Sequence, residues 1–231
     1  EVMGRHAGWI AAAAGLAKND VTHAPHIILF PEISFNQKNF LLKVKEFVAK
    51  DGYCVVVASE GIRNAKGKFL TESDTKDSFG HAQLGGVAPY LSNLVTKNLK
   101  LKTHWAVPDY LQRSARHLSS KVDFMHAQAV GVKAVEYAVQ GMNSVMPIIV
   151  RGKTKKYSWK IEPAPLSKIA NVEKKLPKSF ITKDGFNITN KALDYLKPLI
   201  KGEAEITYKD GLPKISRLKL IEVNKKLSSW S

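Results

Sequence analysis

The sequence predicts an α/β fold with a mainly parallel sheet flanked by helices. Apolar, strand-like runs alternate with helix-like patterns through at least five units. Two of the runs, residues 26–30 and 53–58, are apolar at almost every position, which is typical of strands covered on both faces. The helix-like segments between them carry their apolar side chains in a single stripe, which predicts helices that pack against the sheet.

The first element is a glycine-containing loop that leads into an alanine-rich helix over residues 7–18. Gly4 and Gly8 let backbone N–H groups approach a ligand closely, and the start of a helix carries a partial positive charge. Arg5 adds a guanidinium group that suits a phosphate. The pattern therefore indicates an anion site, but a core helix with a solvated Arg5 explains these residues equally well.

Glu32 follows the buried strand predicted over residues 26–30, at the strand end where α/β folds place ligand groups. Its carboxylate could accept hydrogen bonds from sugar hydroxyl groups. The next helix begins at Asn36 or Gln37 and ends at Asp51-Gly52. After the strand over residues 53–58, Ser59-Glu60-Gly61 forms a turn, for which a structural role is favoured over a functional one.

The middle of the chain predicts a loop, a helix, a strand and a turn. Residues 62–81 are polar and indicate a surface loop. Gly85-Gly86 introduces a helix with Pro89 in its first turn, and residues 101–107 have the pattern of a strand. Residues 109–113 then form a turn in which Arg113 could bind a phosphate by two hydrogen bonds.

A long amphipathic helix over residues 127–139 ends at Gly141. Residues 145–151 predict a strand, which Pro147 assigns to an edge or a bulge. From Gly152 onward the chain is rich in lysine, with a helix-like stretch up to Pro177, a short helix before Gly202 and a hairpin around residues 209–211. No site is visible in this C-terminal region.

Composition excludes several classes of protein. The formal charge is +16, but the lysines alternate with acidic residues and no basic run contains aromatic residues, which argues against a nucleic-acid binder. No apolar run is long enough to span a membrane, so no membrane partner is expected. Cys54 is the single cysteine, which fits a reducing cytoplasm, and the scattered His and Cys residues predict no metal site.

Three motifs in order carry a resemblance to a known family. They are MGRHAGW near the start, HIILFPE at residues 26–32 and HWAVPDYLQRSARH at residues 104–117. The chain resembles the phosphofructokinase family over about residues 1–151. The residues of its motifs are most similar to those of the pyrophosphate-dependent branch. The resemblance implies transfer of a phosphoryl group from pyrophosphate, with Mg²⁺, to the 1-hydroxyl of fructose 6-phosphate.

The resemblance also assigns roles to individual residues. It places Glu32 against the sugar hydroxyls of fructose 6-phosphate, and a group of seven residues around the phosphate and the sugar. This group consists of Met3, Gly4, Arg5, Tyr110, Leu111, Gln112 and Arg113. Where ATP-dependent relatives have an arginine, six residues before Tyr110, this chain has His104. Lys102 and His104 are therefore both candidate phosphate contacts.

The Gly-Gly-Asp and Thr-x-Asp-x-Asp motifs of the family do not occur in the sequence. The catalytic base and the Mg²⁺ ligands are therefore expected upstream of Glu1, in a donor-binding segment that this C-terminal part lacks. The resemblance divides the chain into a fructose 6-phosphate domain (1–112), a crossover helix and strand (113–151) and a Lys-rich extension (152–231). It implies a homo-oligomer, dimeric or tetrameric.

Two alternatives remain open at this stage. An ATP-dependent 6-phosphofructokinase would carry the same acceptor site, because the choice of donor is made upstream. A non-catalytic subunit that binds a sugar phosphate would keep the acceptor site and lack the base.

Overall fold

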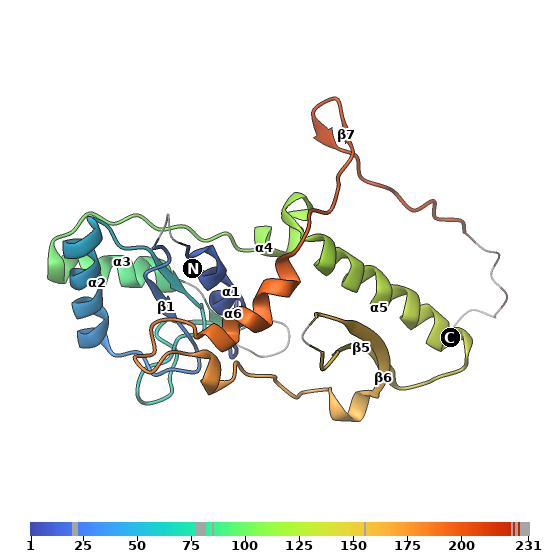
Figure 1. Cartoon of the computed structure of the whole chain (residues 1–231), viewed down its shortest axis with the longest axis horizontal. Coiled ribbons are helices and arrows are strands. Elements are labelled where there is room, and N and C mark those ends of the chain that lie inside the picture. The colour runs from blue at the N-terminus through green and yellow to red at the C-terminus, as the bar shows by residue number, and fades with distance from the viewer. Residues whose placement is uncertain are drawn as a thin grey trace.

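The computed structural model describes residues 1–19, 23–76, 82–84, 86–154, 156–222, 224 and 226. The molecule is elongated and has two lobes, of which the first is an α/β unit (Figure 1). This first lobe consists of α1 (Trp9–Ala14), β1 (Ile27–Leu29), α2 (Gln37–Asp51), β2 (Val56–Ala58), α3 (Val87–Leu99) and α6 (Asn190–Leu196). The α/β class predicted from the sequence is confirmed.

Strands β1 and β2 pair in parallel, with Ile27 opposite Val56 and Leu29 opposite Ala58. Successive side chains of a strand point to opposite faces of the sheet. Ile27 and Leu29 accordingly pack with α2 and α3, and Ile28 packs with α1 and α6 in a second core cluster. The sheet is thus covered by helices on both faces, which explains why these strands are apolar throughout.

Helix α2 has the end signals that the sequence predicts. The Asn36 side chain accepts a hydrogen bond from the backbone N–H of Asn39 at 2.9 Å, and Gly52 closes the helix with a positive φ of 80°. Both devices satisfy backbone groups that a helix terminus leaves without partners. Phe40 and Val44, two members of the predicted apolar stripe, are buried in the core.

The C-terminal region enters the core of the first lobe. Leu176, Phe180, Ile188 and Ala192 pack beside Ala11 and Ala12 of α1. The fit is close, because a Cβ atom on Gly15 would lie 2.6 Å from Cδ1 of Ile188. Residues far apart in the chain therefore share one core. The predicted three-part domain division stays a prediction.

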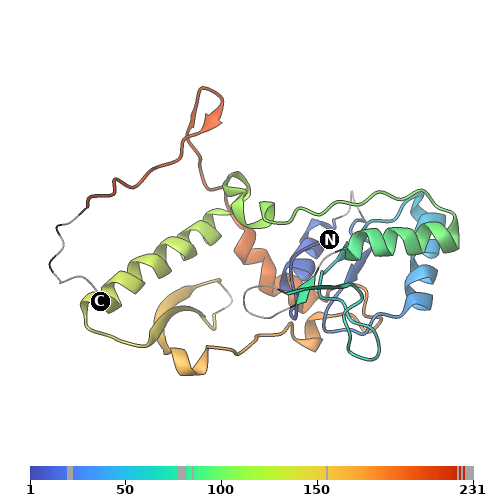
Figure 2. The ribbon, with the colours of Figure 1, turned by 180° about the vertical axis from the view of Figure 1, so that it is seen from behind.

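The second lobe contains α5 (Lys121–Val139), β5 (Val145–Arg151) and β6 (Trp159–Pro165). Strands β5 and β6 pair antiparallel along their full length, and α5 lies beside them when seen from either side (Figure 2). The imidazole of His126 on α5 packs edge-on against the Trp159 ring, with 4.5 Å between centroids. Beyond this lobe, β7 (Tyr208–Lys209) and β8 (Leu212–Pro213) form the small hairpin expected around residues 209–211.

Three predicted elements are corrected by the structure. Residues 101–107 form no strand; their side chains are mostly exposed, and no described strand pairs with them. The polar segment 62–81 is not only a loop, because β3 (Glu72–Lys76) pairs antiparallel with β4 (Ala82–Leu84). The helix-like stretch before Pro177 contains only one 3₁₀ turn, Leu166–Lys168. Residues 77–81 and 85, which include Gly85 of the predicted Gly-Gly turn, lie outside the described residues.

Within the described residues, no helix has both the length and the apolar character needed to cross a membrane. The sixth α-helix, α4 (Leu111–Ser114), is a single turn between the two lobes. Further 3₁₀ turns are formed by Gly15–Ala17, Arg116–Leu118, Lys178–Phe180 and Lys197–Ile200.

A buried histidine holds together the segments that lead into β1 and β2. The Nδ1 atom of His26 accepts a hydrogen bond from the backbone N–H of Val55 at 3.0 Å, and its Nε2 lies 3.3 Å from Oδ2 of Asp51. The His26 side chain is 1% exposed. Burial lowers the pKa of His26 below its ordinary value, although Asp51 acts in the opposite direction.

We predict that the free energy of unfolding decreases as the pH falls through about 6.5, the ordinary histidine pKa. The unfolded chain takes up the proton first, because the pKa of His26 is lower in the folded state. Urea unfolding at pH 7.5 and pH 5.5 measures the difference, and His26→Gln should reduce it. Part of the difference should persist, since burial also lowers the pKa of His126. His117→Gln, a substitution at an exposed histidine, is the control. If the free energy of unfolding differs between the two pH values by the same amount in His26→Gln as in His117→Gln, the assignment to His26 is wrong.

Candidate active site

The Met3-Gly4-Arg5 loop is held by the turn that follows β2. The backbone N–H of Gly4 donates to Oε1 of Glu60 at 3.0 Å, and the Ser59 hydroxyl donates to the Gly4 carbonyl at 2.5 Å. Gly4 has a φ of 145°, a backbone conformation that residues other than glycine rarely adopt. Glu60 thus contacts the Gly4 backbone, and the preference for a structural over a functional role of this residue stays a prediction. The contact of both side chains with the loop could not be read from local sequence.

Gly61 approaches the same loop more closely than any side chain would permit. A Cβ atom at Gly61 would lie 1.8 Å from the Arg5 carbonyl oxygen and 2.6 Å from that of Gly4. Both of these atoms belong to the backbone and cannot rotate away. The Arg5 backbone is thus seated on the Ser59-Glu60-Gly61 turn, and the Arg5 side chain is half-buried.

The predicted Gln-Arg turn meets the loop through the side chain of Gln112. The Gln112 side chain accepts a hydrogen bond at Oε1 from the Met3 backbone N–H, 3.2 Å away, and donates through Nε2 to the Asp109 carbonyl at 3.0 Å. The Arg113 guanidinium carbon lies 5.7 Å from the centroid of the Tyr110 ring. Tyr110 and Leu111 are each 65% exposed, and Arg113 is exposed as well. The turn therefore presents its side chains to solvent beside the loop.

Glu32 joins two further segments. Its carboxylate accepts hydrogen bonds from the backbone N–H of Gly8, at 3.0 Å to Oε1 and 3.2 Å to Oε2. Its Oε1 also accepts from the backbone N–H of Leu176 at 2.8 Å. Gly8 is the residue at the N-terminal cap of α1, so the Glu32 carboxylate lies at the helix start where the sequence indicates an anion site.

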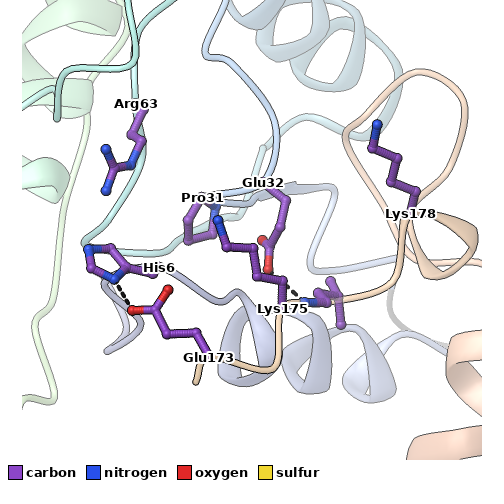
Figure 3. Close-up of a pocket in the computed structure, with 8 residues that line it drawn as sticks. His6, Pro31, Glu32, Arg63, Glu173, Lys175 and Lys178 are labelled. Atoms are coloured by element: carbon purple, nitrogen blue, oxygen red, sulfur yellow. Dashed lines mark hydrogen bonds and ion pairs between the residues drawn. The ribbon is translucent and has the colours of Figure 1, made fainter. Parts of the chain in front are cut away.

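A pocket of about 550 Å³ opens beside Glu32. Its wall is made by His6, Pro31, Glu32, Arg63, Glu173, Lys175, Leu176 and Lys178. Figure 3 shows the imidazole of His6 directed at the carboxylate of Glu173, with which it forms a hydrogen bond. This hydrogen bond lowers the pKa of Glu173 below its ordinary value. No local signal in the sequence marks the pocket residues of the C-terminal segment, because their lysines and glutamate resemble an ordinary solvated surface.

Lys102 and His104 lie in a different place from Glu32. Both line a groove between α2, α3 and β2, together with Trp105 and Glu1. The backbone nitrogen of Glu1 donates to the Ala106 carbonyl at 2.9 Å, which links this groove to the loop. The structure brings Met3 to Gln112, and Gly8 to Glu32, but it does not bring Lys102 or His104 into the pocket at Glu32.

The side chains that the structure describes do not form a metal site. In the part of the chain that the structure describes, no three His, Cys, Asp or Glu residues are grouped so that they could hold an ion. Glu32 and Glu173, the two carboxylates of the pocket, are engaged by backbone N–H groups and by His6, respectively.

The chain matches known proteins along its whole length. Residues 1–138 match the family model described as Phosphofructokinase. Pyrophosphate–fructose 6-phosphate 1-phosphotransferase of Xanthomonas campestris is 59% identical over 232 residues, which cover 100% of this chain and 56% of the relative. The protein of the same name from Halomonas elongata is 52% identical, covering 100% of this chain and 55% of the relative.

Among solved structures, pyrophosphate-dependent phosphofructokinase from Nitrosospira multiformis superimposes with a TM-score of 0.85 at 53% identity. The match covers 100% of this chain and 54% of that one. The chain therefore spans about half the length of the relatives it matches. The phosphofructokinase-like α/β fold is confirmed, and the chain belongs to the phosphofructokinase family.

Proposed function

We propose that this chain supplies the sugar-phosphate acceptor site of a pyrophosphate-dependent phosphotransferase that converts fructose 6-phosphate to fructose 1,6-bisphosphate. The contact between Met3 and Gln112 is the single observation that carries the proposal. It unites two of the motifs on which the family resemblance rests, from positions far apart in the chain. The names of the relatives support the choice of substrate and of donor.

The residues at this junction suit a phosphorylated sugar. Arg113 offers a planar, permanently charged fork that can bind two phosphate oxygens, and the Tyr110 hydroxyl is an orientable partner. A carboxylate has about four acceptor positions. Glu32 uses some of these for the N–H groups of Gly8 and Leu176, which leaves capacity for a sugar hydroxyl. The chain's own residues thus bind and orient the acceptor.

Chemistry on the donor side does not follow from the described residues. Mg²⁺ would neutralise the charge of the transferring phosphoryl group, and its ligands and the catalytic base are not among the groups described above. We therefore propose that Mg²⁺ and pyrophosphate bind to residues outside this chain. The proposal includes a homo-oligomer, and a cytoplasmic location because the substrates are phosphorylated metabolites.

The full-length protein should form fructose 1,6-bisphosphate from fructose 6-phosphate and pyrophosphate in a coupled assay. Activity with ATP instead of pyrophosphate would select the ATP-dependent alternative. Binding of fructose 6-phosphate without transfer from either donor would select the non-catalytic subunit. Absence of both binding and transfer would refute the proposal.

We predict that Arg113→Ala raises the KM for fructose 6-phosphate by about 10- to 100-fold, because a charge-assisted pair of hydrogen bonds contributes about 1.5–3 kcal/mol. Glu32→Gln should raise the same KM, since the amide cannot accept on both atoms. Steady-state kinetics of the full-length protein provides the test, with Arg217→Ala at an exposed position as control. An unchanged KM in both variants would refute the assignment of the site.

Gly61→Ala should also raise the KM for fructose 6-phosphate, because its Cβ atom would displace the backbone of Arg5 and Gly4. Gly131→Ala is the matched control: a Cβ at Gly131, within α5, meets no atom within 4 Å. Alanine is favoured over glycine in a helix by about 1 kcal/mol, so this control should be neutral or slightly stabilising. If the KM for fructose 6-phosphate is the same in the Gly61→Ala and Gly131→Ala variants, the position of the Arg5 loop does not affect substrate binding.

A further inference from the structure

The groove between α2, α3 and β2 follows an open edge of the sheet. It encloses about 530 Å³, and its helical walls are apolar; they include Phe40, Val44, Val48, Leu91 and Val95. In the part of the chain that the structure describes, β2 pairs as a strand only with β1, on its other edge. An apolar groove along an unpaired strand edge is a template for a further strand.

Two large apolar side chains at this groove are exposed. Val55, just before β2, is 39% exposed, and Trp105 on the opposite side is 58% exposed. Residues 101–106 form that opposite side, and none of the described strands pairs with them. The groove thus lies between β2 and a second strand-like segment, and both lack the cover that a parallel sheet normally has.

Glu1 and Val2 join the two sides at one end of the groove. The N–H of Val2 donates to the Ala58 carbonyl at 2.8 Å, and the Val2 carbonyl accepts from the Glu60 N–H at 2.9 Å. On the other side, the backbone nitrogen of Glu1 donates to the Ala106 carbonyl. The bonds of Val2 have the pattern of a parallel ladder, in which one residue bonds to the two residues that flank its partner.

We infer that, in the full-length protein, the residues immediately before Glu1 fill this groove as a strand between β2 and residues 101–107. Alternate residues of a strand direct their backbone groups to the same edge, so those of Val56 face the groove as those of Ala58 do. Val2 lies opposite Ser59 in parallel, and continuing this register backwards places the second residue before Glu1 opposite Val56. Pairing on the other side makes residues 101–107 the strand that their sequence predicts.

The groove specifies an extended and apolar occupant. Side chains directed at α2 and α3 meet Phe40 and Leu91, and those on the other face lie on the side of Val2 and Val57, which pack against the core at α1. This chain spans about half the length of its relatives, which have further residues to supply the segment. A segment of the same chain is favoured over a second copy, because Glu1 already lies at the end of the groove.

Hydrogen exchange of the wild-type full-length protein tests whether the groove is filled. A strand in the groove gives the N–H groups of His104 and Ala106 acceptors, so peptides from residues 101–107 should exchange at least about tenfold more slowly than those from 214–221. Residues 214–221 are exposed and have no regular structure, and so provide the control. Exchange at the same rate in the two segments would overturn the inference.

A disulfide cross-link identifies the occupant. Paired strands lie about 4.8 Å apart, which is within the range of Cα separations that a disulfide joins. In a full-length Cys54→Ala protein, Val56→Cys is combined with a cysteine at the second position before Glu1. Mild oxidation should link the two within one chain, as measured by mass spectrometry of the unreduced peptides.

The matched control moves the added cysteine to the first position before Glu1, where its side chain points to the opposite face of the sheet. We expect this protein to form no bridge to Val56→Cys. A bridge between two chains, an equal yield in both proteins, or no bridge in either would overturn the inference. Neither measurement depends on catalysis, so the outcome is independent of the activity assay that tests the proposed function.

Discussion

The Glu32 carboxylate is the interaction on which the arrangement of the site depends. It accepts hydrogen bonds from the start of α1 and from the C-terminal segment at Leu176, and so joins three parts of the chain that are distant in sequence. A half-buried carboxylate is stable there because backbone donors replace the water that it loses. The same contacts hold one wall of the pocket in place. The Arg5 loop is positioned separately, by the Ser59-Glu60-Gly61 turn.

Local signals predicted much of the fold, and interactions between distant residues account for the rest. The cap of α2 at Asn36, its end at Gly52 and the buried strand at Ile27 are recognisable from residue type and spacing. Residues 101–107 have a strand-like pattern, but a strand exists only when another backbone pairs with it, and none of the described strands does. The burial of Leu176, Phe180 and Ile188 was not predicted, because these apolar residues lie in a lysine-rich region and tertiary packing decides their burial.

The site residues also divide into those that sequence motifs mark and those that only the tertiary structure reveals. Gly4, Glu32 and Gln112 could be proposed because family motifs mark them, and the structure brings the loop to Gln112 and Gly8 to Glu32. The pocket residues Lys175 and Lys178 were not predicted, because an isolated lysine carries no local signal of a pocket. Their place opposite Glu32 is visible only in the structure, where residues 173–178 pack against the N-terminal part of the chain. Fold, loop and pocket thus form one connected unit in which the C-terminal segment takes part.

A crystal structure of the full-length protein with fructose 6-phosphate bound would test the central claim most directly. The account predicts that the sugar phosphate lies between the Met3-Gly4-Arg5 loop and the Gln112-Arg113 turn, with a sugar hydroxyl donating to Glu32. A ligand bound elsewhere, with Glu32 still contacting only Gly8 and Leu176 and with Arg113 still facing solvent, would contradict it.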